Sequence, residues 1–184
     1  MIFKKCSVGN STYGEPSNVD EASSEVIGAV ETMAPSARKK IRNLIYCSPP
    51  SAQGNALREF FTMLAVCHTV VVEKDVLNMK KTKEEFGNLK YSASSPDELA
   101  LVQGAKEVGI IYHKRVGNII SIGIGNGINP STIEEFETIV EFPFDSTRKR
   151  MSLIVKQLGS GKYFLMTKGA DSIMLPRIKI DIQT

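Results

Sequence analysis

The sequence has few of the groups that zinc sites, disulfide frameworks and membrane anchors require. Its three cysteines, Cys6, Cys47 and Cys67, are odd in number and lack the spacing of zinc ligands, so we expect reduced thiols and no zinc site. The longest apolar run, near 60–72, contains polar residues and is shorter than the roughly 20 residues of a membrane helix. Lys4 and Lys5 are followed by a polar stretch rather than the apolar segment of a secretory signal. These absences predict a cytosolic chain without membrane spans.

An excess of charge of one sign is also lacking. The net charge is +3 in 184 residues, and basic residues are mixed with acidic ones except at 148–150. A nucleic-acid surface needs a basic face with interleaved exposed aromatics, so we expect no nucleic-acid partner. A content of 42% hydrophobic and 23% charged residues fits one globular domain over 1–184.

Complete catalytic machinery is missing as well. Cys67 and His68 have the chemistry of a nucleophile and a base, but neighbouring side chains diverge and no third partner is evident. The glycines of 123–127 have a dinucleotide-like rhythm, yet Pro130 rather than a helix follows them. We therefore expect no catalysis at the first pair and a simple loop at the glycines.

The pattern of apolar and turn residues predicts an α+β fold, with an antiparallel β-sheet flanked by helices. We expect a variable, partly disordered insertion at about 13–53, with weak helices at 19–32 and 37–46. A hairpin turn is expected at 159–161. The expected strands are 2–8, 69–72, 110–116, 118–124, 135–142, 151–157 and 162–167. The expected firm helices are 55–67, 96–108 and a short one at 172–175 capped by Asp171.

One helix start has a strong local signature. Ser95, Pro96, Asp97 and Glu98 match a capping box, in which the serine hydroxyl caps the helix and the glutamate reaches back to the serine N–H. Gly109 is placed to end the same helix.

Two short segments have the chemistry of a nucleotide site. In 142–152 an aromatic, Phe144, stands near Ser146 and a run of cations, and 168–171 reads Lys-Gly-Ala-Asp. An exposed ring can stack on a base, while lysine and arginine can contact phosphate. The residues alone leave ordinary alternatives open, because Phe144 could pack in the core and the cations could form a solvated turn.

Five segments, taken together, resemble a known family. Residues 3–8, 64–70, 91–102, 144–152 and 168–171 are similar, in order, to the cytosolic nucleotide-binding domain of the phospholipid-flippase class of P-type ATPases. The Ser-Pro-Asp-Glu and Arg-Lys-Arg-Met-Ser sequences resemble lipid flippases more than ion pumps. This resemblance implies ATP binding, with adenine stacked on Phe144, Glu98 near the adenine amine, Ser146 and Lys149 lining the pocket, and Lys168 as the lysine of the Lys-Gly-Ala motif.

Other parts of that family do not occur in the sequence. They are the phosphorylated aspartate of the Asp-Lys-Thr-Gly-Thr motif, a downstream arginine near the phosphates, the magnesium-binding aspartates and the membrane helices. The resemblance therefore implies a C-terminally incomplete, excised domain that binds ATP without turnover. In the parent, it implies Mg²⁺, partner phosphorylation, actuator and transmembrane domains, an accessory membrane subunit, a phospholipid substrate, and a place at the cytosolic face of a membrane.

Two alternatives stand beside this expectation. A flippase-like module could serve as a non-catalytic regulatory or scaffolding domain in a larger fusion protein. A nucleic-acid binder could use the cations of 148–150, although the rest of the chain lacks a matching basic face.

Overall fold

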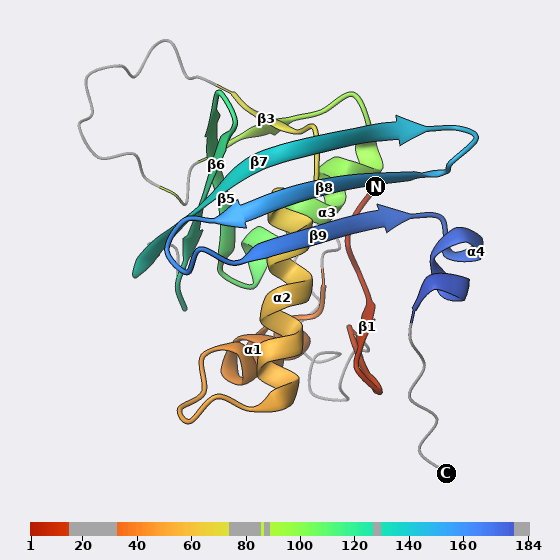
Figure 1. Ribbon diagram of the computed structural model, residues 1–184. Coiled ribbons are helices and arrows are strands. Elements are labelled where there is room, and N and C mark those ends of the chain that lie inside the picture. Colours follow the sequence, from red (N-terminus) through yellow and green to blue (C-terminus); the bar gives the residue numbers. More distant parts are fainter. Residues whose placement is uncertain (15–32, 74–85, 87–88, 127–129, 179–184) are drawn as a thin grey trace.

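The computed structural model describes residues 1–14, 33–73, 86, 89–126 and 130–178 (Figure 1). In chain order the elements are β1 (Cys6–Val8), β2 (Ser11–Tyr13), α1 (Pro35–Ile45), α2 (Ala52–Val66), β3 (Val71–Val72), β4 (Tyr91–Ser92), α3 (Pro96–Glu107), β5 (Ile110–Val116), β6 (Ile119–Ile124), β7 (Thr132–Asp145), β8 (Arg150–Gln157), β9 (Tyr163–Gly169), α4 (Asp171–Met174) and the 3₁₀ turn η4 (Leu175–Arg177).

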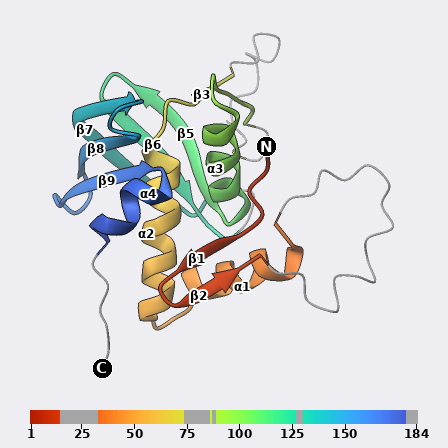
Figure 2. The ribbon, with the colours of Figure 1, turned by 90° about the vertical axis from the view of Figure 1, so that its right-hand side faces the viewer.

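The main sheet is an antiparallel meander with the strand order β5-β6-β7-β8-β9. Each strand pairs with the next one along the chain, as short connections favour. Along β8, Met151, Leu153 and Val155 alternate toward the buried side of the sheet, where α2 and α3 pack (Figure 2). The predicted α+β fold with an antiparallel sheet and flanking helices is confirmed.

The core is filled by aliphatic and aromatic side chains from both the helices and the sheet. Helix α2 contributes Leu57 and Phe61, which are fully buried, and the sheet contributes Ile122, Phe136 and Leu153. The same cluster of buried residues continues through α1. The helices are therefore part of the core that supports the sheet.

Helix α1 lies inside the range predicted as a variable insertion, where the weak helix at 37–46 was expected. Its side chains Ala37, Ile41 and Ile45 are buried, and Met33 just before it is also buried. This part of the range is thus a component of the core. The helix expected at 19–32 lies outside the described residues.

Several expected boundaries differ from the structure. The first strand covers only Cys6–Val8, and it pairs with β2, a strand that was not predicted. Helix α2 begins at Ala52, three residues earlier than expected, because the hydroxyl of Ser51 accepts a hydrogen bond from the N–H of Gly54. Strand β7 continues to Asp145, so Phe144 lies within the strand.

The glycine run and the short C-terminal helix also differ. Gly123 lies in β6 rather than in a loop. Gly125 donates its N–H to the carbonyl of Gly109 at 3.0 Å, and Gly127 lies outside the described residues. Asp171 is the first residue of α4 and not its cap, which is Ala170. The Asp171 carboxylate instead accepts a hydrogen bond from the N–H of Ser172.

Candidate functional site

The best-defined part of the candidate site is an ion pair between two elements that are far apart in the sequence. Glu98 lies in the first turn of α3, and Lys168 lies near the end of β9. The Oε1 of Glu98 accepts a hydrogen bond from the Nζ of Lys168 at 2.6 Å, and their side chains are 15% and 16% exposed. A charged pair with so little solvent contact holds both side chains in a fixed position.

The second carboxylate oxygen of Glu98 is also bonded. It accepts hydrogen bonds from the backbone N–H of Thr69 at 3.1 Å and from its hydroxyl at 2.5 Å. Burial opposes ionisation of Glu98, but the hydrogen bonds from Lys168 and Thr69 outweigh it, so the pKa of Glu98 is lowered. Glu98 is therefore a carboxylate that ties together α3, β9 and the segment before β3.

This arrangement corrects half of the capping-box prediction. Ser95 caps α3 as expected, since its hydroxyl accepts a hydrogen bond from the N–H of Glu98 at 3.4 Å. The Glu98 carboxylate does not reach back to Ser95, because Lys168 and Thr69 hold both of its oxygens. An ionised partner binds a carboxylate more strongly than a neutral backbone N–H does.

Cys67 and His68 lie beside this pair but have separate structural partners. Burial raises the pKa of Cys67 to about 11, although Lys168 lies nearby and lowers it. The Nδ1 of His68 accepts a hydrogen bond from the N–H of Val70 at 3.1 Å, and its Nε2 bonds the carbonyl of Ala65 at 3.0 Å. The imidazole is thus a neutral tautomer with its proton on Nε2. This geometry supports the core and does not activate the thiol.

A tight turn joins β7 to β8 next to the end of β9. The Oδ1 of Asp145 accepts hydrogen bonds from the N–H groups of Thr147 and Arg148 at 2.9 and 2.8 Å. Lys149 closes the turn with φ of 51° and donates its N–H to the carbonyl of Asp145 at 2.6 Å. The residue types of 145–149 thus fix the backbone that carries Ser146 and Lys149.

The backbone connects this turn to the lysine strand. The carbonyl of Lys149 accepts a hydrogen bond from the N–H of Ala170 at 3.1 Å. A Cβ added at Gly169 would lie only 2.5 Å from that carbonyl oxygen, so the close approach requires glycine. Figure 1 shows β7 and β9 ending at the same edge of the molecule, where α4 begins. The two sequence segments of the predicted site therefore meet.

Phe144 is exposed at this edge. Its relative exposure is 65%, which excludes the alternative that it packs in the core. Ser146 and Lys149 are also exposed, whereas Lys168 is half-buried. The structure thus has an exposed aromatic ring on the strand that enters a polar turn. Lys168, which is ion-paired with Glu98 of α3, lies on β9. The end of that strand is hydrogen-bonded to the turn.

The arginines of the turn are partly engaged by other groups. The guanidinium of Arg148 lies 5.6 Å from the centre of the Phe142 ring, a cation–π distance. Arg150 Nη1 donates a hydrogen bond to the carbonyl of Arg148 at 3.3 Å. Strand β8 begins at Arg150, so Arg148 belongs to the turn. Lys149 is the more exposed cation at this turn.

One contribution to the site was not predicted. Thr69 anchors Glu98 through two hydrogen bonds. Thr69 had been interpreted only as a strand residue, and its contact spans 29 positions of sequence. No local pattern could have indicated that contact.

In the described ranges, no three His, Cys, Asp or Glu side chains gather as metal ligands. Two carboxylates lie among the candidate residues: Glu98 accepts hydrogen bonds from Lys168 and Thr69, and Asp145 accepts them from the N–H groups of its own turn. Because both carboxylates are engaged by protein donors, this cluster does not fit a Mg²⁺ site. No helix in the described part of the chain is long and apolar enough to cross a membrane.

Comparison with known proteins decides the family. Residues 56–179 match the family described as P-type ATPase, cytoplasmic domain N. The chain belongs to this family. The matched range contains α3, the whole main sheet and every residue of the candidate site.

The similar proteins are phospholipid-transporting ATPases. Phospholipid-transporting ATPase 10 of Arabidopsis thaliana is 32% identical over 97% of the chain, which covers 16% of that relative. Phospholipid-transporting ATPase IH of Homo sapiens is 40% identical over 71% of the chain and 11% of the relative. Phospholipid-transporting ATPase IC of Xenopus tropicalis is 33% identical over 98% of the chain and 13% of the relative. The sequence of this domain N thus spans a small fraction of these relatives.

Proposed function

We propose that this domain N binds ATP and positions it for phosphorylation of an aspartate outside the chain, as part of a phospholipid-translocating P-type ATPase. The observation that supports this most directly is the 65% exposure of Phe144 on the strand that leads into the turn of Ser146 and Lys149. Membership of the family and the names of the relatives support the wider setting.

Each site residue has a physical role in this proposal. The ring of Phe144 stacks on adenine, and burial of two flat surfaces provides the main attraction. Lys149 and Lys168 supply positive charge for the nucleotide, and Ser146 supplies a hydroxyl. Glu98 orients Lys168 through their ion pair, and its Oε1, which accepts the Lys168 hydrogen bond with one lone pair, can accept a second one from the adenine amine.

Binding in this way contributes proximity rather than chemistry. Holding the γ-phosphate near an acceptor makes the transfer effectively unimolecular. Mg²⁺ would neutralise charge on the transferred phosphoryl group, with ligands supplied from outside the described cluster. The other parts of the proposal are partner phosphorylation, actuator and transmembrane domains, a phospholipid substrate and a location at the cytosolic face of a membrane.

The test is an ATP titration of the chain, followed by backbone amide NMR. We expect the amides of Phe144, Lys168 and 95–98 to shift together, because the ion pair and the turn connect them. Shifts confined to 148–150 would indicate a nonspecific basic turn and would contradict the adenine site.

Phe144→Ala sharpens the same test. Base stacking on an aromatic is worth about 1–3 kcal/mol, so we expect ATP binding to weaken roughly 5-fold to 140-fold. Tyr163→Ala is a matched control, since Tyr163 is 64% exposed on β9 but lies at the opposite end of that strand from Lys168. Equal affinity of Phe144→Ala and the unmodified chain would exclude the stack.

A further inference from the structure

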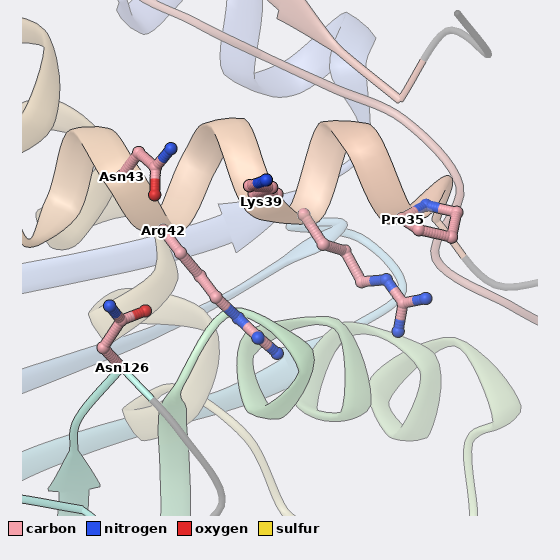
Figure 3. Close-up of a pocket in the computed structure, with 6 residues that line it drawn as sticks. Pro35, Lys39, Arg42, Asn43 and Asn126 are labelled. Atoms are coloured by element: carbon pink, nitrogen blue, oxygen red, sulfur yellow. The ribbon is translucent and has the colours of Figure 1, made fainter. Parts of the chain in front are cut away.

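One face of α1 is polar and carries a cluster of cations. The residues of this face lie at positions i, i+3, i+4, i+7 and i+8, counted from the first residue of the helix, and such positions form one continuous stripe. On α1 these residues are Pro35, Arg38, Lys39, Arg42 and Asn43. Together with Asn126, which follows β6, they line a cavity of about 490 Å³ (Figure 3). We call this cavity the α1 pocket. The other side of α1 is buried in the core.

Arg42 is held in place by the end of α3. Its Nε and Nη2 atoms donate hydrogen bonds to the carbonyl of Glu107 at 3.1 and 2.5 Å. These two bonds fix the plane of the guanidinium and leave the N–H groups of Nη1 for another acceptor. A guanidinium fixed in this way loses little conformational freedom when it binds an anion.

The charges of the α1 pocket do not balance. Arg38, Lys39 and Arg42 carry three positive charges. The carboxylate of Glu107 lies close enough to interact with Arg38 and Arg42, and its buried Oε2 has no hydrogen-bond partner among the described residues. Among the described residues of this region, three cations and one carboxylate leave an excess of two positive charges at the cavity. The adjacent Lys40 does not contribute, because its Nζ lies 5.6 Å from the centre of the Tyr13 ring.

We propose that the α1 pocket binds a phosphomonoester dianion, either free or as the headgroup of a lipid. A phosphomonoester carries about −1.5 to −2 charges at neutral pH, which matches the excess. Its oxygens can accept paired N–H donors from Arg38 and Arg42, and the Lys39 ammonium and the amides of Asn43 and Asn126 are further donors. The α1 pocket is formed by different residues from the proposed ATP site, so this proposal does not rest on it.

The experiment uses one phosphomonoester from each source. Glycerol 3-phosphate is the soluble probe, followed by backbone amide NMR, and it has no base to stack on Phe144. Vesicles of phosphatidylcholine with and without phosphatidic acid are the lipid probe, measured by cosedimentation. Binding of either probe, with shifts of α1 amides for the soluble one, supports the proposal and identifies the source.

Two neighbouring lysines provide the matched variants. Lys39→Gln removes a charge from the α1 pocket, and Lys40→Gln removes the same charge from the same helix on another side. We expect Lys39→Gln to weaken binding about 3-fold to 5-fold and Lys40→Gln to leave it unchanged. Equal weakening in both variants would reduce the effect to general charge and overturn the proposal, as would no binding of either probe.

A third variant should act in the opposite direction. Glu107→Gln removes the opposing carboxylate while keeping the backbone carbonyl that holds Arg42. We expect it to tighten binding about 3-fold, because the repelling charge is lost. Weaker binding in this variant would show that the phosphate does not lie beside Glu107.

Discussion

At the scale of single residues, His68 is a buried titratable group whose pKa is shifted by its surroundings. It is 4% exposed, its ring packs edge-on against Tyr112 with centroids 4.4 Å apart, and both of its nitrogens are hydrogen-bonded to backbone. Burial lowers the pKa of His68 from 6.5 to about 4. The folded chain therefore keeps this imidazole neutral at pH values where the unfolded chain protonates it.

This lowered pKa predicts a loss of stability in mild acid. Between pH 6.5 and about 4 the unfolded state binds a proton that the folded state does not, so the free energy of unfolding falls as the pH falls. The slope is about 1.4 kcal/mol per pH unit, which gives roughly 2 kcal/mol between pH 7 and pH 5. Urea unfolding at the two pH values measures it. His68→Gln should be nearly independent of pH in this range, and an equal slope in that variant would contradict the assignment.

The role of a residue could be predicted where it depends on the residue type and its neighbours in sequence. It could not be predicted where it depends on a partner far away in sequence. The serine cap at Ser95 and the candidate residues Phe144 and Lys168 follow from short patterns. Phe144 lies at the end of β7 and Lys168 near the end of β9, and both strands pair antiparallel with β8. The side-chain bond of Glu98 could not be predicted, because its partner Lys168 is 70 positions away. The capping-box pattern takes into account only a donor that is close in sequence, the backbone N–H of the N-cap residue.

At the scale of elements, the junction between the β7–β8 turn and β9 controls the geometry of the site. Lys149 lies in the turn and Lys168 on β9, and Gly169, which follows Lys168, lies against the backbone of Lys149 and Arg150. A Cβ at Gly169 would meet backbone atoms of Lys149 and Arg150, and backbone cannot move aside as a flexible side chain can.

Gly169→Ala should therefore loosen this junction. We expect the free energy of unfolding to fall by about 1–3 kcal/mol, the usual result of forced overpacking, and the amides of Lys149 and Lys168 to shift in NMR spectra. Gly159→Ala is the control, since nothing lies within 4 Å of its added Cβ. A Gly169→Ala variant as stable as the control would show that the turn moves freely relative to β9.

Helices and strands could be predicted from the sequence where their apolar residues follow a clear period. Strands β5, β6, β8 and β9 were predicted to within two residues, because apolar residues and hairpin glycines bound them. Strand β2 is only three residues long and has one buried side chain, Tyr13. Helix α1 has a narrow apolar stripe among cations, so its packing against α2 could not be predicted from its composition.

At the scale of the whole molecule, one continuous cluster of buried residues lies between the α1 pocket and the proposed nucleotide site. That cluster includes Ile41 in α1, Phe61 in α2, and Leu153 and Met166 beneath the sheet. Because the side chains of this cluster are closely packed, loss of packing in α1 also destabilises the packing beneath the sheet. We therefore propose that 33–45 and the main sheet unfold as one cooperative unit, although the sequence predicted a variable insertion at about 13–53.

Ile41→Ala tests whether α1 and the main sheet unfold together. Ile41 is fully buried, so its truncation should lower the free energy of unfolding by about 2–4 kcal/mol. The same substitution at Ile133, which is 50% exposed on β7, should change it by less than about 1 kcal/mol. In urea, amide signals from α1 and from β9 should be lost at the same midpoint in each variant, because both elements depend on the same buried cluster. If Ile41→Ala lost the α1 signals first while β9 stayed folded, α1 would be a separate unit, and the cluster would not couple the two sites.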